Sequence, residues 1–140
     1  MSRGLVLLIV AAAAASTQAA WSACTTALYE AREALKTAGS ACLSQYSADI
    51  EKYVANPNCT SSDLWYGEDT CNAIVANAMK CIVKAVKLLK ADNTFDDAAF
   101  KATTLKNKCS ADAKFIAAYP KCRNHTMKYW RLDQLCNCLT

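Results

Sequence analysis

Cysteine is the residue type with the most chemistry to offer in this chain, which contains nine among 140 residues. Cysteines this frequent in a small chain form disulfides in an oxidising compartment, whereas in a reducing one they more often bind metals. Because nine is odd, at most four bridges form within one chain and at least one thiol is left over. The predicted bridge-forming residues are Cys24, Cys42, Cys59, Cys71, Cys81, Cys109, Cys122 and Cys136.

The leftover thiol is assigned to Cys138, which lies near the C-terminus and one residue away from Cys136. In this interpretation Cys138 is unpaired or joins a second copy of the chain in a covalent homodimer. An equally open alternative is that Cys138 is bridged and a buried cysteine elsewhere is free.

Spacing excludes some pairings and disfavours a metal site. Cys71 and Cys81 are ten residues apart on one predicted helix, which separates them by about 15 Å. Bridged Cα atoms lie within about 7 Å, so each of these cysteines must reach a different element. Cys42 and Cys59 flank another predicted helix and are too far apart as well. No C-x2-C pair occurs and His125 is the sole histidine, so we expect neither a metal nor any other cofactor.

The N-terminus has the layout of a secretory signal peptide. Arg3 precedes an unbroken apolar run over residues 5–15, and small residues follow at Thr17 and Ala19. The run is shorter than the roughly 20 residues that a membrane span requires. We therefore predict a signal peptide over 1–19, no transmembrane segment, and a secreted, extracellular single domain over 20–140.

The composition predicts an all-α fold, because only three glycines and two prolines are available for turns. Apolar residues recur at helical spacing, with expected ends at Gly39 as a left-handed cap, Asn56-Pro57, Asp92-Asn93 and Pro120. Thr94 with Asp97 resembles a capping box, and Ser110 is a further candidate cap. We expect a compact disulfide-cross-linked bundle of five to six helices. The predicted helices cover residues 22–39, 41–55 and 70–91, a segment opening at residue 94, then 111–119 and 126–135.

Catalysis is not expected. The stretch Lys121–Met127 resembles the active-site segment of secreted phospholipases A2, which carry Cys-Cys-x-x-His-Asp and bind calcium. Here Lys121 replaces the first cysteine, Thr126 replaces the aspartate, and no glycine-rich calcium loop precedes them. Insect odorant-binding proteins are similar in being secreted, helical and disulfide-tied, but their C-x3-C spacing is absent, so the resemblance is one of architecture.

Charge is divided unevenly along the chain, with net −4 over residues 20–70 and net +7 over residues 71–140. The excess of positive charge in residues 71–140 suggests a basic surface patch that binds an anionic partner. Basic residues on a solvent-exposed helix face would give the same pattern. Asn58 and Asn124 each begin an N-glycosylation sequon. The possible basic patch comprises Lys80, Lys84, Lys87, Lys121, Arg123, Lys128 and Arg131.

These features predict a secreted, non-enzymatic binding protein whose partner is an extracellular protein or a small hydrophobic ligand, not a nucleic acid. It would carry a small apolar ligand, or act on a receptor or channel through exposed aromatics such as Trp65 and Tyr66. An apolar cavity would favour the carrier, whereas a filled core would favour the effector. The alternative is a membrane-active defence protein or toxin that uses the basic amphipathic helix 70–91.

Overall fold

The computed structural model describes residues 20–60 and 68–140, so the predicted leader over 1–19 and the aromatic residues Trp65 and Tyr66 lie outside the described residues. The predicted all-α bundle is confirmed, since this part of the chain has six α-helices and no strand beyond a single isolated bridge. The helices are α1 (Ala23–Gln45), α2 (Ser47–Ala55), α3 (Glu68–Ala85), α4 (Asp97–Ala99), α5 (Ala113–Thr126) and α6 (Leu132–Leu139). Two 3-10 turns, η1 (Pro57–Cys59) and η3 (Met127–Tyr129), and one π-helical turn, η2 (Phe100–Thr104), complete them.

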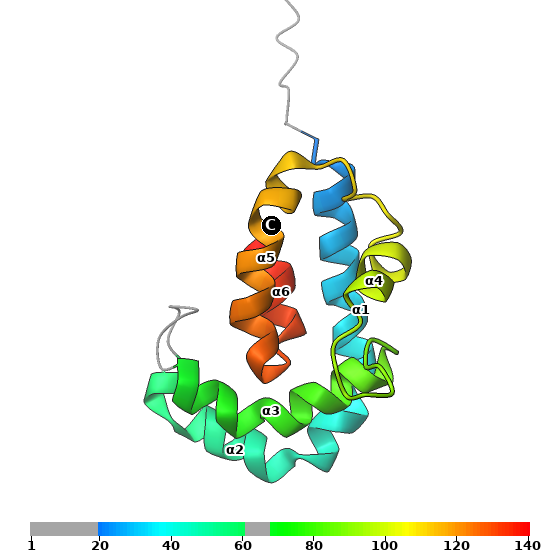
Figure 1. Cartoon of the computed structure of the whole chain (residues 1–140). Coiled ribbons are helices and arrows are strands. Elements are labelled where there is room, and N and C mark those ends of the chain that lie inside the picture. Colours follow the sequence, from blue (N-terminus) through cyan, green and yellow to red (C-terminus); the bar gives the residue numbers. More distant parts are fainter. Residues whose placement is uncertain (1–19, 61–67) are drawn as a thin grey trace, which may run out of the picture.

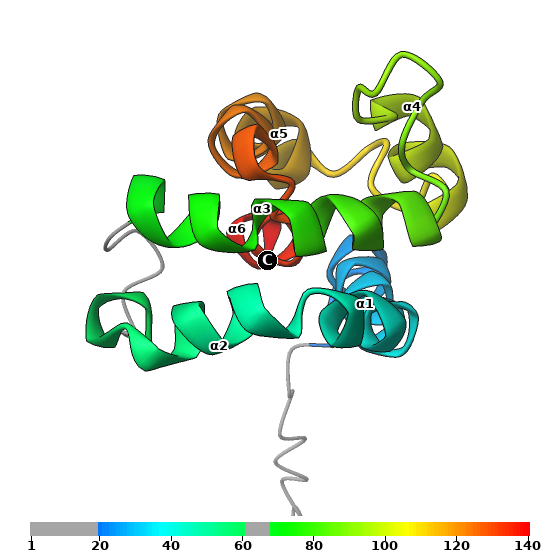
Figure 2. The ribbon, with the colours of Figure 1, turned by 90° about the horizontal axis from the view of Figure 1, so that it is seen from below.

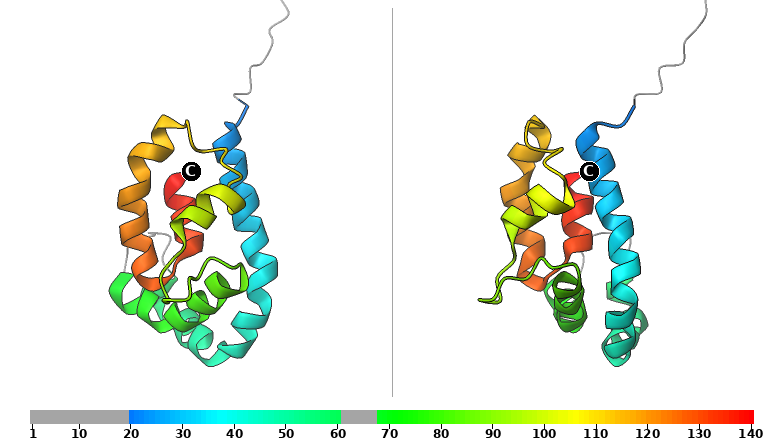
Figure 3. Two further views of the ribbon diagram at one scale, coloured as in Figure 1. Left: turned by 45° about the vertical axis from the view of Figure 1, so that its right-hand side comes forward. Right: turned by 90° about the vertical axis from the view of Figure 1, so that its right-hand side faces the viewer.

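The helices form two groups. In Figure 1, α1, α5 and α6 stand upright, and α2 and α3 lie beneath them. Figure 2, the view from below, shows α2 and α3 side by side, and both α1 and α2 contact α3. The segment with α4 and η2 passes in front of α6, with α5 and α1 on either side (Figure 3, left).

The core lies where α1, α6 and the η2 segment meet. Its largest fully buried side chains include Leu28 of α1, Phe100 of η2 and Leu135 of α6. Ring contacts continue the core towards α5, with centroid distances of 5.7 Å from Phe100 to Phe95 and 6.2 Å from Phe100 to Tyr119. Such aromatic burial is a main source of stability in a chain of this size.

Four disulfides connect separate elements, as the spacing predicted. The bridges have Cα–Cα distances from 4.5 to 5.8 Å, and none joins Cys71 to Cys81 or Cys42 to Cys59. They join α1 to the segment before α5, α1 to α3, η1 to α3, and α5 to α6. The pairs are Cys24–Cys109, Cys42–Cys81, Cys59–Cys71 and Cys122–Cys138.

The assignment of Cys138 as the leftover thiol is wrong, because Cys138 is bonded to Cys122. Cys136, predicted to be bridged, is instead the free cysteine in the described part of the chain, and it is fully buried. The physical reason is the helical register of α6. Cys136 and Cys138 are two positions apart on this helix, so they project about 200° apart. The Cys138 side chain is placed for the bridge to α5, and Cys136 points into the core.

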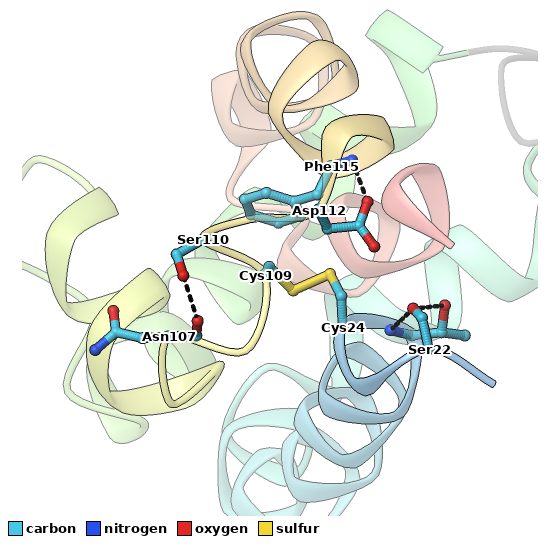
Figure 4. Close-up of a disulfide and its surroundings, with 8 residues drawn as sticks. Ser22, Cys24, Asn107, Cys109, Ser110, Asp112 and Phe115 are labelled. Atoms are coloured by element: carbon cyan, nitrogen blue, oxygen red, sulfur yellow. Dashed lines mark hydrogen bonds between the residues drawn. A yellow bond between two sulfur atoms is a disulfide. The ribbon is translucent and has the colours of Figure 1, made fainter.

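The Cys24–Cys109 bridge lies next to two helix starts (Figure 4). Ser22 caps the N-terminus of α1 by accepting a hydrogen bond from the Thr25 backbone N–H at 3.0 Å. Asp112 caps the N-terminus of α5 by accepting a hydrogen bond from the Phe115 backbone N–H at 2.9 Å. The cap is therefore Asp112 and not the predicted Ser110. Both caps satisfy backbone donors that the first helical turn leaves free.

Two predicted helix ends are wrong because tertiary packing overrides local preference. α1 continues through Gly39, which is buried, and a Cβ atom at this position would lie 3.1 Å from the Ile82 side chain of α3. Glycine here permits a close approach of two helices. Pro120 lies inside α5. The missing N–H removes one hydrogen bond, but Tyr119 and Cys122 on either side are buried against the rest of the bundle.

The other helix boundaries also differ. α3 ends at Ala85 rather than near residue 91, since Lys87 adopts a left-handed φ of 60° and turns the chain so that Leu88 is buried. Asp96, not Thr94, caps α4 by accepting from the Ala99 backbone N–H at 2.9 Å. The last helix begins at Leu132, after Trp130 interrupts the chain with a φ of 63°.

This bridge pattern predicts one thiol per chain, hidden in the folded protein. A charged thiol reagent should label almost nothing in the native state and one group after unfolding in guanidinium without reductant, because Cys136 is buried. The Cys136→Ser variant should give none in either state. Two or more thiols per unfolded chain, or rapid labelling of the native protein, would contradict the pattern.

Candidate functional site

An apolar pocket of about 290 Å³ opens between α1, the chain just after α3, η2 and α6. Its walls combine side chains from segments far apart in sequence, which the fold brings together. Most of the wall is aliphatic or aromatic, and charge occurs only at the mouth. The lining residues are Glu30, Ala31, Ala34, Leu35, Val86, Leu88, Phe100, Thr104, Lys106, Leu132 and Cys136.

Small and large side chains on facing elements create this space. On α1, Ala31 and Ala34 present only methyl groups, so α1 leaves room where leucines would fill it. Opposite them, η2 is a π-helical turn in which the Leu105 backbone N–H donates to the Phe100 carbonyl at 2.9 Å. Such turns recur at functional sites because the inserted residue redirects side chains. Here Phe100 and Thr104 of η2 both line the pocket.

Buried groups from three segments form the inner wall, with Leu88, Phe100, Leu132 and Cys136 all at most 3% exposed. Burial, and then the negative charge of Asp133, raise the pKa of the Cys136 thiol to about 12. Cys136 therefore remains a neutral thiol at physiological pH. Since the thiolate is the nucleophilic and metal-binding form, Cys136 acts here as an apolar wall group.

The mouth of the pocket carries a pair of opposite charges. Lys106 Nζ lies 3.7 Å from Glu30 Oε2, and both side chains are more than half exposed to solvent. Lys106 and Asn107 adopt left-handed φ angles of 52° and 56°, which bend the chain after η2 back towards α1. The Cys24–Cys109 bridge, three residues further on, fixes this turn beside α1.

A polar cluster on the α5 side anchors the segment that carries η2. Asp97 at the start of α4 accepts hydrogen bonds from Tyr119 Oη at 2.7 Å and from Arg123 Nε and Nη2 at 3.1 Å each. The Lys101 ammonium lies 4.1 Å from the centre of the Tyr119 ring. Burial raises the pKa of the Asp97 carboxyl, but the hydrogen bonds from Arg123 and Tyr119 outweigh burial and hold this pKa below its ordinary value. Burial and the Asp97 contact raise the pKa of Tyr119 well above its usual range.

The basic residues predicted as one patch differ in their surroundings: Lys80 and Lys84 line one surface pocket together with Lys90, whereas others are paired or buried. Arg131 is buried, with Nη1 donating to Asn72 Oδ1 at 2.5 Å and Nη2 to Asp133 Oδ2 at 2.9 Å, so it belongs to no surface patch. Arg123 is paired with Asp97. Lys128 lies 3.1 Å from Asp69, and Lys80 lies over the Trp130 ring at 5.2 Å. The residues outside these pairs, Lys84, Lys87 and Lys121, are exposed.

Both predicted glycosylation sites lie at the surface. Asn58 is exposed in η1, and Asn124 is exposed in α5, on a helix rather than in the expected loop. Within residues 20–60 and 68–140, no group of three or more His, Cys, Asp or Glu side chains could hold a metal ion. Over the same ranges, no helix has both the length and the apolarity needed to cross a membrane.

Sequence reasoning missed the pocket and an exposed aromatic pair. The Trp21 and Tyr29 rings lie 5.5 Å apart at the start of α1, and the two residues are 63% and 45% exposed. The signal that could have revealed the pocket is Ala31, a small residue between the larger Leu28 and Leu35 on the core-facing side of α1.

Comparison of the chain with protein-family models, with curated proteins and with solved structures found no significant match. Support for a function therefore comes from the geometry of the described residues. Among them, the apolar pocket and the polar groups at its mouth are the arrangement best suited to hold another molecule.

The Asp97 cluster predicts a loss of stability in acid. The folded-state pKa of Asp97 lies below its ordinary value of 3.8, so its contribution is complete above that value and is lost as the pH falls through the folded-state pKa. The urea midpoint should therefore fall less steeply for Asp97→Asn than for the wild type between about pH 5 and pH 2. Glu51→Gln, at an exposed position of α2, is the control and should keep the wild-type slope. An unchanged slope in Asp97→Asn would contradict this role.

Proposed function

We propose that this protein is an extracellular carrier that binds one small, largely apolar molecule in the pocket between α1, η2 and α6, and that it does no chemistry on that molecule. The observation that carries the proposal is a mostly apolar pocket whose inner wall is formed by the buried side chains of Leu88, Phe100, Leu132 and Cys136. Pockets of this kind, apolar with a few polar groups at one end, are the usual form of small-molecule sites. The neutral Cys136 thiol fits this role, because it offers neither a nucleophile nor a metal ligand.

The pocket volume limits the ligand. At about 290 Å³ it lies at the low end of the roughly 300–1,000 Å³ of ligand sites, and it is about twice an engineered cavity of ~150 Å³ that binds benzene. A single ring with a short side chain, or a compact branched chain, fills such a space. A long acyl chain would extend beyond it.

An extracellular location is supported by the four disulfides. Such bonds persist in secreted proteins and are rare where glutathione keeps thiols reduced. The leader predicted over residues 1–19 points in the same direction.

The membrane-active alternative has less support. It requires α3 to expose an apolar face, yet Val75, Ala78 and Val83 are at most 2% exposed between neighbouring helices. The bridges at Cys71 and Cys81 tie α3 to η1 and α1. A receptor-directed role would rest on the exposed pair Trp21 and Tyr29.

Calorimetric titration of the oxidised protein with butylbenzene, indole and 4-ethylphenol tests the proposal. We expect saturable binding of at least one of them to the wild type. Ala34→Trp, which places a large ring at the pocket lining, should weaken that binding at least about tenfold, a change of about 1.4 kcal/mol.

The matched control is Ala117→Trp, at an exposed position of α5 outside the lining, which should bind like the wild type. Far-ultraviolet circular dichroism shows whether each variant is folded. Wild-type protein that is folded but binds none of the three compounds, or equal binding by both variants, would overturn the proposal.

A further inference from the structure

The charged pair at the pocket mouth can select the ligand. Glu30 lies one residue before Ala31 on α1, and Lys106 lies two residues after Thr104 of η2, so both charges adjoin the apolar wall. Apart from the Thr104 hydroxyl, the other lining side chains are apolar. A ligand held against Phe100 and Leu132 therefore meets polar groups at the mouth.

The backbone fixes where these two charges stand. Glu30 belongs to a long helix, and the turn that carries Lys106 is held by backbone hydrogen bonds of 2.9 Å from Asn107 N–H to the Lys101 carbonyl and from Lys108 N–H to the Leu105 carbonyl. The Cys24–Cys109 bridge joins the two segments covalently. The backbone positions of Glu30 and Lys106 at the mouth are therefore fixed, and there Lys106 Nζ lies 3.7 Å from Glu30 Oε2.

The two charged groups make no direct hydrogen bond with each other. The 3.7 Å from Lys106 Nζ to Glu30 Oε2 exceeds the about 2.7–2.9 Å of a hydrogen-bonded ion pair. An ammonium group only donates hydrogen bonds and a carboxylate only accepts them. A hydroxyl group does both, so one hydroxyl can donate to Glu30 and accept from Lys106 at the same time.

Charged and purely apolar ligands fit this mouth less well. An anionic head group would pair with Lys106 but be repelled by Glu30, and a cationic one would meet the reverse. A hydrocarbon would leave both charges to water and gain nothing from them. A neutral hydroxyl can form a hydrogen bond with each charged group, and it adds no charge of its own to the mouth.

We propose that the ligand is a small apolar molecule with a single neutral hydroxyl group, an alcohol or a phenol, whose hydroxyl lies between Glu30 and Lys106. This inference rests on the proposed carrier function and names the ligand class of the same pocket. Glu30 and Lys106 are then the residues that determine specificity, and the apolar wall supplies most of the affinity.

The test compares two probes of nearly equal shape, 4-ethylphenol and 4-ethyltoluene, which differ by a hydroxyl in place of a methyl group. Calorimetry gives the ratio of their dissociation constants for the wild type and for the double variant Glu30→Gln with Lys106→Met. We expect the ratio to shift by about tenfold towards the hydrocarbon in the double variant, because hydrogen bonds to charged groups are lost. Using the ratio cancels any general change in the pocket.

The chain provides a matched control in Glu33 and Lys36, a second pair on α1 with Lys36 Nζ 2.7 Å from Glu33 Oε1 and outside the pocket lining. Glu33→Gln with Lys36→Met should leave the ratio unchanged. Two charged probes, 4-methylbenzoate and 4-methylbenzylamine, complete the series and should bind more weakly than 4-ethylphenol.

The outcomes separate the two proposals. Binding of both neutral probes with the same ratio in all variants would overturn the hydroxyl inference and leave the carrier function standing. Tighter binding of either charged probe than of 4-ethylphenol would also overturn it. Failure of both neutral probes to bind folded wild-type protein would count against the carrier function itself.

Discussion

The bridge between Cys24 and Cys109 is the constraint on which the pocket depends most. It ties the start of α1 to the turn that follows η2, across 85 residues of sequence. Closing a loop of this length restricts the unfolded chain by an amount worth about 4.6 kcal/mol in the chain-entropy treatment. In the folded state it also holds the turn that carries Lys106 beside α1, which carries Glu30. Each of the other three bridges likewise joins two separate elements, and none lies within a single helix.

Cross-links of this kind allow a small protein to keep a space that packing alone would tend to fill. Apolar side chains normally pack at high density, and the atoms that line a void lose van der Waals contacts. Here disulfides join the two ends of α1 to the segment after η2 and to α3. Between them, Ala31 and Ala34 have small side chains that leave space beside the helix. The Asp97 cluster fastens η2 from the opposite side. The pocket is thus framed by covalent and hydrogen-bonded contacts outside its own wall.

The fold class followed from the sequence because helical periodicity and scarce turn residues are local properties. The exclusion of a Cys71–Cys81 bridge followed from helix geometry alone. The helix ends predicted at Gly39 and Pro120 are wrong because tertiary packing decides the conformation at both positions. Gly39 lies against Ile82 of α3, and Pro120 lies within the packed helix α5. The identity of the free cysteine depended on the register of α6, which begins six residues later than predicted. The pocket was beyond sequence reasoning, since it exists only where four segments meet.

Xenon uptake tests the apolar pocket without any choice of ligand chemistry, because an apolar pocket that stays dry binds xenon. Crystals of the oxidised protein under xenon pressure should show a xenon atom between α1, η2 and α6, against Phe100, Leu132 and Cys136. A pocket filled with ordered water molecules, or closed by movement of the side chains that line it, would show that no dry apolar site exists here.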